Sequence, residues 1–263
     1  MTIATGDDRY YRMALNLLKS YRIYCKNPKP FAIICDRENI ITEQFDDVVL
    51  LDKCYQSFMD KIDLPINVPY DENIFIDADC LAYRDLNEYW NLFENADDFS
   101  SIGCIYDVER DNVGWFSKSG TGEFCDKIHF ITHLHGGIYF IRKSDTVIQL
   151  NHLCHYIVKH YSDYTFSQFN GEPADEPVFA LAMAVMNLKP EEYPPEYVCF
   201  YPSTTMLFSD ITKGQLVFSA PWCPETISKG FLCHWSNYCI DQPIYKAEVY
   251  RLSALYEGRT ISQ

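Results

Sequence analysis

Two aspartates at the end of an apolar run are the residues in this sequence best suited to chemistry. Asp77 and Asp79 flank Ala78 directly after the segment Ile-Phe-Ile at positions 74–76. Carboxylate oxygens suit Mg²⁺ or Mn²⁺, which take their remaining ligands from substrate phosphates. A bend would bring both carboxylates onto one ion, and a solvated turn is the structural alternative. We expect the buried run to fix the pair at the edge of a sheet, where ligands bind.

The histidines offer further ligand atoms. His129 and His133 are spaced as on one face of a helix, and His135 follows closely. A zinc site needs three or four ligands with supporting hydrogen bonds, and no Cys-x-x-Cys pair accompanies these residues, so we predict no dedicated zinc site there. His234, beside Trp235, is either a core histidine or a ligand.

Apolar runs and helical spacing outline the elements that must position these groups. Tyr11, Leu15 and Leu18 recur at helical spacing, which predicts a helix from Asp8 to about Tyr24. Short apolar runs predict buried strands at residues 1–5, 31–36, 46–52, 73–77 and 100–107. This alternation favours βαβ units and a mostly parallel sheet. Because three of these strands end in aspartate, we expect a binding edge at Asp36, Asp52 and Asp77.

The rest of the sequence is less regular. We expect a strand at 136–142 that leads to a helix from Asp145 to about Tyr161, and a buried helix within 172–189. A last helix is expected from Lys246 to Tyr256. The aromatic residues of the loop before the histidine cluster are candidates to face an acceptor molecule, namely Trp115 and Phe116.

Composition and charge restrict the class of protein. With 22 Lys and Arg against 37 Asp and Glu, the formal net charge is −15, which disfavours duplex nucleic acid as a general partner. The 11 cysteines are scattered and odd in number, which favours buried free thiols in a reducing compartment. No apolar run approaches the roughly 18 residues of a membrane span, and no basic and apolar leader opens the chain. We expect a cytoplasmic protein, and leave peripheral membrane association and a homo-oligomer open.

An ordered set of motifs resembles a known family. The sequence resembles bacterial nucleotide-sugar glycosyltransferases of the GT-A fold, of the glycogenin-like and lipopolysaccharide galactosyltransferase-like family. The resemblance spans roughly residues 1–235 and is carried by ATGDDRYYRMALNLLKSY, FAIICD, DENIFIDADCLAY, HGGIYFIRKSD, PADEPVFALAM and LCHWSN. It implies an α/β fold with a Rossmann-like mixed central sheet flanked by helices. It also implies one domain over 1–263, with a nucleotide-binding half to about 105, an acceptor and catalytic half over about 106–240, and a C-terminal tail helix.

The resemblance also implies which residues bind the donor nucleotide and the metal. The family's metal-binding triplet matches Asp77 and Asp79, with Ala78 near the ribose, and its third metal ligand matches His234. The implied ion is Mn²⁺ or Mg²⁺. The contacts with base and ribose carry over to Ala4, Thr5, Gly6, Asp7 and Tyr10. Asp7 has a structural alternative as the cap of the first helix.

A second set of residues is implied to act on the donor sugar. Lys61 matches a basic residue that contacts the donor, while His135 and Gly136 stand in the family's Asn-Ala-Gly segment. The family's Asp-Gln pair near the reacting sugar is Asp175-Glu176 here. Asp175 is expected to stabilise an oxocarbenium-like state, or is only a helix N-terminal acid. Glu176 is expected to orient the acceptor or a sugar hydroxyl.

The implied function is metal-dependent transfer of a sugar from a UDP-linked donor to a glycan or glycoconjugate acceptor, with retained configuration, in polysaccharide biosynthesis. One departure is that no Lys follows His234 at the spacing of the family's diphosphate clamp. This departure favours an alternative, a non-catalytic homologue that binds a nucleotide sugar or carbohydrate. A sugar-phosphate nucleotidyltransferase is a third reading, disfavoured because ATGDDRYY has one glycine and two acids in place of a Gly-rich basic loop.

Overall fold

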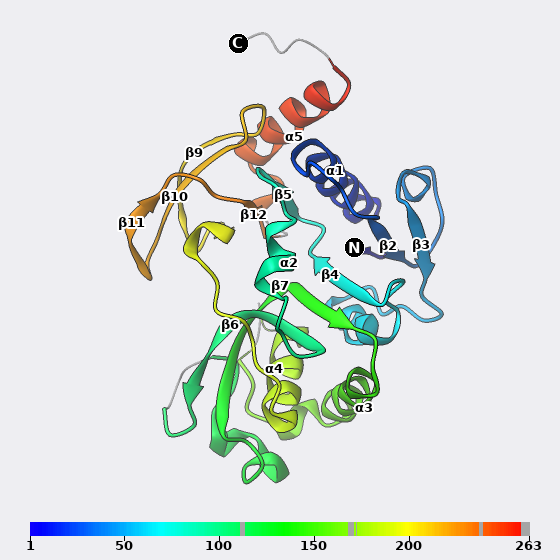
Figure 1. The fold of residues 1–263 in the computed structure, drawn as a ribbon. Coiled ribbons are helices and arrows are strands. Elements are labelled where there is room, and N and C mark those ends of the chain that lie inside the picture. The colour runs from blue at the N-terminus through cyan, green and yellow to red at the C-terminus, as the bar shows by residue number, and fades with distance from the viewer. Residues whose placement is uncertain (111–113, 168–170, 172, 237–238, 259–263) are drawn as a thin grey trace. The chain divides into compact units, whose positions relative to one another are not determined.

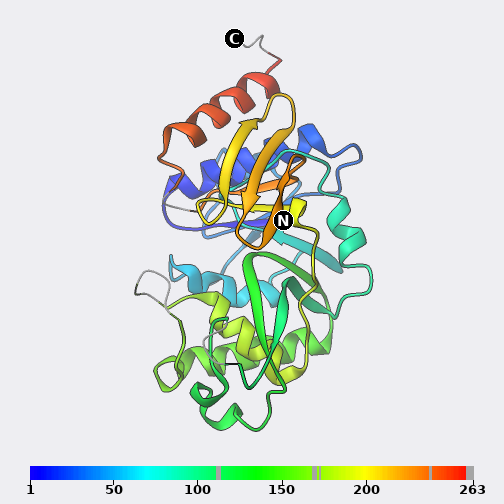
Figure 2. The same ribbon diagram turned by 90° about the vertical axis from the view of Figure 1, so that its left-hand side faces the viewer.

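The computed structural model describes residues 1–110, 114–167, 171, 173–236 and 239–258 (Figures 1 and 2). The chain forms two compact units whose segments alternate along the sequence. Unit 1 comprises Met1–Leu50, Ile76–Asn91 and Pro194–Gln263, and unit 2 comprises Leu51–Phe75 and Leu92–Tyr193. The expected division of a single domain into a nucleotide-binding half and an acceptor half stays a prediction.

Unit 1 begins with a parallel sheet of β1 (Thr2–Ala4), β2 (Ala32–Cys35) and β3 (Asp47–Leu50). All four side chains of β2 are buried, as expected for the middle strand of a parallel sheet. Helix α1 (Asp8–Tyr24) follows β1, and the side chain of Asp7 caps it by accepting a hydrogen bond from the Arg9 amide.

A second sheet of unit 1 joins three segments that lie far apart in the sequence. Strand β12 (Leu232–His234) pairs antiparallel with β5 (Cys80–Ala82) and parallel with β8 (Val198–Phe200). The three strands are almost entirely buried. Helix α1 packs against β5 and lies beside α5 (Pro243–Tyr256) (Figure 1).

A third sheet of unit 1 is the antiparallel meander of β9 (Thr205–Asp210), β10 (Gln215–Ala220) and β11 (Cys223–Ile227), drawn in yellow and orange in Figure 2. Glu248 of α5 is fully buried and accepts hydrogen bonds from the Ile211 amide at 2.7 Å and the Tyr83 hydroxyl at 3.2 Å. This carboxylate ties the turn between β9 and β10 to α5 and to the segment that follows β5.

Unit 2 is built on the sheet of β4 (Glu72–Ile76), β7 (Phe130–Arg142) and β6 (Phe99–Asp107), with β7 in the middle. Helix α4 (Asp175–Met186) packs on β7 and against α3 (Asp145–Lys159). The core contains an aromatic cluster in which the ring of Tyr139 lies 5.0 Å from Phe179 and 5.5 Å from Phe99. Helix α2 (Glu88–Leu92) lies at the boundary between the two units in the sequence. The described residues also include 3₁₀ helices at Thr42–Gln44, Phe58–Ile66, Lys118–Gly120, Gly122–Phe124, Tyr161–Asp163 and Pro195–Tyr197.

Most of the predicted elements are confirmed, including α1 at both ends. The predicted burial of the strand at 46–52 is wrong, because β3 is mostly exposed. One part of the predicted topology is wrong: β6, which we grouped with the parallel strands, pairs antiparallel with β7. A continuous apolar run marks a buried strand but does not reveal its direction, which explains the error. All 11 cysteines are free thiols, as predicted. Burial was also predicted, and it is confirmed for seven of them but wrong for the half-buried Cys54, Cys104, Cys125 and Cys223.

The described part of the chain contains no helix that is both long enough and apolar enough to cross a membrane.

Candidate functional site

The Asp-Ala-Asp triplet forms a turn between two buried strands of the chain. Strand β4 ends at Ile76, whose amide donates to the Met1 carbonyl at 3.0 Å, and β5 begins at Cys80. The Cys80 amide donates to the Asp77 carbonyl at 3.1 Å and closes the turn. The chain therefore bends between the two aspartates, as the first of the two sequence interpretations requires.

Strand pairing brings His234 to this turn. In the register of β12 and β5, His234 lies opposite Cys80, and the Trp235 amide donates to the Asp79 carbonyl at 3.1 Å. The imidazole Nε2 lies 3.0 Å from Asp79 Oδ1 and 3.8 Å from Asp77 Oδ2. All three side chains are 12–15% exposed. Both carboxylates thus converge on one imidazole nitrogen, although the histidine lies far along the chain.

The packing of Trp235 holds the end of β12. Its ring is fully buried and lies 5.5 Å from the ring of Tyr201 and 5.4 Å from that of Tyr245. The Tyr201 amide donates to the His234 carbonyl at 3.0 Å. The backbone at His234 and Trp235 is therefore held by hydrogen bonds from both neighbouring segments.

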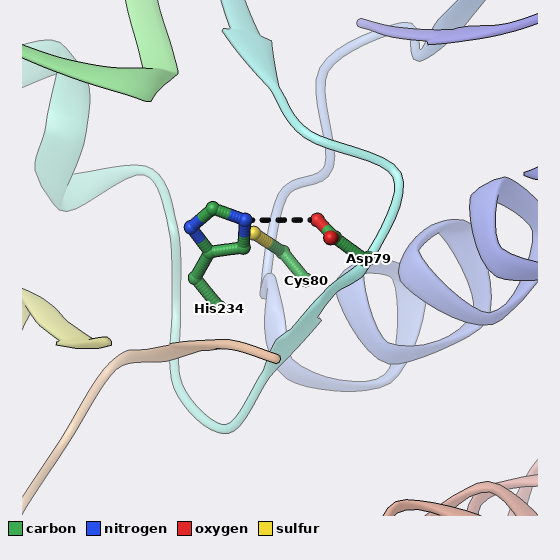
Figure 3. Close-up of side chains that lie close together, drawn as sticks. All are labelled: Asp79, Cys80 and His234. Carbon is green, nitrogen blue, oxygen red and sulfur yellow. Dashed lines mark ion pairs between the residues drawn. The ribbon is translucent and has the colours of Figure 1, made fainter. Parts of the chain in front are cut away.

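Cys80 belongs to the same cluster, although the sequence analysis did not select it. Ligand atoms of Asp79, Cys80 and His234 all lie within 4.8 Å of one another (Figure 3). These residues are the one group of three metal-ligating side chains found among the described residues. The signal was present in the sequence, because the cysteine directly follows Asp79.

The donor atoms of this cluster fit a divalent metal ion. Asp77 and Asp79 offer carboxylate oxygens and His234 offers a ring nitrogen, a set that suits Mn²⁺ or a similar ion. His234 Nε2 and Asp79 Oδ1 lie 3.0 Å apart, so both atoms can bind one ion placed between them. The three residues predicted as metal ligands, Asp77, Asp79 and His234, therefore lie close together in unit 1.

The loop between β1 and α1 is held in place from β2. Gly6 has a positive φ of 73°, which favours glycine, and its amide donates to Asp36 Oδ2 at 3.1 Å. Tyr11 donates its hydroxyl proton to the other oxygen of Asp36, and the Arg37 guanidinium donates to the Gly6 carbonyl at 2.7 Å. Burial, followed by the hydrogen bond to Asp36, raises the pKa of Tyr11. Asp36 thus fixes the loop.

The predicted nucleotide-binding residues lie along this loop. Ala4 is buried at the end of β1, Thr5 and Tyr10 are half-buried, and Asp7 is exposed. The guanidinium of Arg9 stacks on the Tyr10 ring and donates to its hydroxyl at 2.7 Å. Asp7 acts as the cap of α1, which was its structural alternative. A base-binding role for these residues stays a prediction.

In unit 2, the predicted sugar-site residues form a cluster of their own. The ammonium group of Lys61 lies 3.6 Å from Asp175 Oδ2, and the side chains are 11% and 4% exposed. The same carboxylate accepts the hydroxyl proton of Tyr139 at 3.1 Å. Asp175 is also the first residue of α4, where the helix dipole favours a negative charge. It is therefore both a helix N-terminal acid and an ion-pair partner, and sequence reasoning missed Tyr139.

Glu176, the next residue of α4, closes on the backbone of β7. Its Oε1 accepts the Gly136 amide at 2.7 Å, and the Gly136 carbonyl accepts from Lys61 Nζ at 3.2 Å. The ring nitrogen Nδ1 of His135 accepts the Gly137 amide at 3.2 Å. A Cβ atom at position 136 would lie 2.3 Å from the Glu176 side chain, so a larger residue fits there only if Glu176 shifts. The structure thus gathers Lys61, His135, Gly136, Asp175 and Glu176 within unit 2.

Other candidates from the sequence have structural roles. His133 lies on strand β7, on the exposed side opposite Cys104, and its ring packs against Tyr106. The helical spacing inferred for the histidine cluster is therefore wrong. Phe116 is 4% exposed, so its ring does not face solvent as an acceptor contact would. Trp115 is half-buried and donates its indole proton to the Leu134 carbonyl at 3.2 Å.

A sheet with an acidic turn after a buried strand, and helices around it, is the architecture of the GT-A fold, and comparison with solved structures shows this fold for the chain. An active-site mutant of the galactosyltransferase LgtC is 13% identical, with a TM-score of 0.58, over 100% of this chain and 98% of that one. LgtC in complex with donor and acceptor sugar analogues gives 13% identity and a TM-score of 0.57 over the same shares.

A third similar structure is that of the bifunctional glycosyltransferase WbbM without ligands. It is 12% identical, with a TM-score of 0.51, over 95% of this chain and 51% of that one. No known family and no curated protein matches the sequence. The resemblance inferred from the sequence motifs is therefore confirmed at the level of the fold.

Proposed function

We propose that the protein is a metal-dependent glycosyltransferase that moves a sugar from a UDP-linked donor to a glycan or glycoconjugate acceptor. The observation that carries this proposal is the convergence of Asp77, Asp79 and His234 at a sheet edge of a GT-A fold. Retention of the anomeric configuration is part of the proposal, because the resembling family retains it.

In this proposal, Asp77, Asp79 and His234 hold a divalent ion, Mn²⁺ or Mg²⁺. The ion supplies a Lewis acid for the diphosphate leaving group, on which negative charge develops when the sugar–phosphate bond breaks. The low exposure of the three side chains strengthens their attraction for a cation, because little water screens it. Because the net charge of the protein is −15, an anionic donor needs a bound cation to offset the repulsion between the two.

The loop after β1 is assigned to the nucleoside. The exposed carboxylate of Asp7 accepts the Arg9 amide through Oδ1 and offers its other oxygen to ribose hydroxyls or base amides, while Tyr10 offers an aromatic ring for the base. Ala4 and Ala78 leave room for a ribose because their side chains are small. Anchoring of the loop by Asp36 supports this role, because a binding loop that is already ordered loses less entropy when it binds.

The cluster in unit 2 is assigned to the transferred sugar. Asp175 is assigned to stabilise positive charge on the sugar, and Lys61 and Tyr139 hold its carboxylate in place. Glu176 offers its second carboxylate oxygen to a sugar hydroxyl, since Oε1 is already bonded to the Gly136 amide. His135, next to Gly136 on β7, is assigned a further contact with the sugar.

The proposal is tested by measuring release of UDP from a panel of UDP-sugars, with Mn²⁺ or with EDTA, in the presence of mixed glycan acceptors. We expect release that depends on the metal, and Asp79→Ala should abolish it. Asp47→Ala is the matched control. Asp47 is also an acid of unit 1, but it is exposed and lies at the amino end of β3, away from the proposed metal ligands in the sequence. Equal rates for the Asp79→Ala variant and the native protein would contradict the proposal.

The alternative functions are distinguished by this assay together with a second one that supplies a nucleoside triphosphate and a sugar phosphate. Binding of a UDP-sugar without turnover would identify a non-catalytic homologue. The observation in its favour is that Lys246, the next lysine after His234, is 63% exposed on α5 and pairs with Asp241 at 3.4 Å. Formation of diphosphate from a nucleoside triphosphate and a sugar phosphate would identify a nucleotidyltransferase.

A further inference from the structure

Cys80 directs its thiol toward the same point as the predicted metal ligands (Figure 3). His234 and Cys80 face each other in the antiparallel pair of β12 and β5. The backbone bond from Trp235 to Asp79 flanks them, so they form a non-hydrogen-bonded pair, the kind in which side chains on one face approach most closely. The closeness of the sulfur to the imidazole therefore follows from the register of the sheet.

The spacing of the three side chains is close to that of a metal site. Zinc bonds of about 2.0 to 2.3 Å place two ligands of a tetrahedral ion about 3.3 to 3.6 Å apart. The ligand atoms of Asp79, Cys80 and His234 lie within 4.8 Å of one another, so movements of about 1 Å bring them to that spacing. Cys80 is fully buried and the side chain of Asp79 is 12% exposed, so few water molecules compete with the ion.

A thiol changes which ion such a site prefers. Carboxylates select hard ions such as Mg²⁺ and Mn²⁺, whereas a thiolate binds Zn²⁺ and Co²⁺ much better than it binds Mg²⁺. Asp79, Cys80 and His234 together present one oxygen, one sulfur and one nitrogen, each a common zinc ligand. The Asp77 carboxylate lies 3.8 Å from the imidazole but is outside this group of three, so Asp79, Cys80 and His234 carry the site.

We propose that Cys80 is a metal ligand and that its thiolate makes this site selective for Zn²⁺ over Mn²⁺ and Mg²⁺. The inference rests on the metal-binding role proposed above for Asp79 and His234. Binding breaks the S–H bond, forms a metal–sulfur bond and releases one proton to solvent, so no oxidation or reduction takes place. Which ion occupies the site then depends on the available concentrations of both zinc and manganese.

Cobalt tests the sulfur ligand directly. We titrate the metal-free protein with Co²⁺ and record the near-ultraviolet absorption that arises only from charge transfer between thiolate sulfur and cobalt. We expect this band in the native protein and in Cys154→Ser, whose cysteine is fully buried in unit 2. We expect it to be absent from Cys80→Ser and Cys80→Ala, with circular dichroism confirming that both variants are folded.

Competition between metals tests the selectivity. Free Mn²⁺ has an electron paramagnetic resonance signal that is lost on binding, so the Zn²⁺ concentration that restores it reports the ratio of the two affinities. Loss of a sulfur ligand is expected to raise that concentration by about 10- to 100-fold in Cys80→Ser, while Mn²⁺ affinity changes little. Zinc generally binds more tightly than manganese, so the change in the ratio is the informative quantity.

The outcomes separate this inference from the proposed function. A native protein without the sulfur–cobalt band, a band that persists in Cys80→Ser, or an unchanged ratio would each overturn the inference. Metal-dependent UDP release in that case would leave the proposed function intact. A sulfur–cobalt band in a protein that never releases UDP would support the inference and contradict the proposed function.

Discussion

Lys61 and Asp175 form a buried ion pair whose strength a double-mutant cycle can measure. The charged atoms are 3.6 Å apart, and the side chains are 11% and 4% exposed. With an effective dielectric constant of about 20, two unit charges at this distance attract by about 4.6 kcal/mol. Because Lys61→Met leaves Asp175 with the Tyr139 hydrogen bond and the helix dipole, we expect a loss of about 3 kcal/mol, the low end for breaking a buried pair.

The cycle combines Lys61→Met and Asp175→Asn, and urea unfolding gives the free energy of unfolding of each variant. We expect the double variant to lose less stability than the sum of the single variants, with a coupling energy of about 2 to 4 kcal/mol. The control pair, Lys118 and Glu109, has almost the same separation of 3.5 Å, but its side chains are 33% and 80% exposed. Its coupling should stay below about 1 kcal/mol.

Two results would refute this reasoning. Equal coupling energies for the two pairs would mean that burial does not strengthen the interaction between Lys61 and Asp175. A loss of less than about 1 kcal/mol in Lys61→Met would mean that Asp175 tolerates a buried, unpaired charge, which the desolvation argument forbids.

Three further predictions follow from single contacts. Tyr139→Phe removes a hydrogen bond to a buried carboxylate, so urea unfolding should show a loss of about 1.5 to 3 kcal/mol, and an unchanged midpoint would contradict this. Gly136→Ala forces a Cβ atom into the Glu176 side chain, so stability should fall by about 1 to 3 kcal/mol and partly recover when Glu176→Ala is added. Burial raises the pKa of Cys25 to about 12 and that of Cys35 to about 11 from the model-compound value of 9.0. Above pH 9 these two thiols ionise only in the unfolded chain, which favours unfolding. Each thiol should therefore lower the free energy of unfolding by about 1.4 kcal/mol per pH unit until its folded pKa is reached. Unfolding measured against pH should show a smaller loss when either cysteine is replaced by alanine.

Features with a local cause could be predicted from the sequence. Helix α1 has helical spacing, an acidic cap at Asp7 and a proline-containing segment after it, so its bounds followed from neighbouring residues. The turn at Asp77 follows from an apolar run that stops at two acids. These signals act over a few residues, and periodicity is sufficient to detect them.

Features that depend on strand register could not be predicted from periodicity. The contact of His234 with Asp79 requires β12 to pair with β5, and the motif resemblance suggested it where the residue pattern alone did not. Cys80 was read as one more buried thiol, because its burial and its neighbours fit that description equally well. Tyr139 stands in an apolar run, and its ring packs in the core, while its hydroxyl donates to a carboxylate that is 36 residues away in the sequence.

Strand β12 also determines when, during synthesis, the metal ligands can assemble. Asp79 leaves the ribosome long before His234, and β5 lacks one of its neighbours until Leu232–His234 has been made. A nascent chain that stops before β12 therefore carries both carboxylates but no imidazole to gather them. In the proposed function, the full set of cation ligands is therefore present only after β12 has been made, so a nascent chain that ends before β12 lacks the complete cation site.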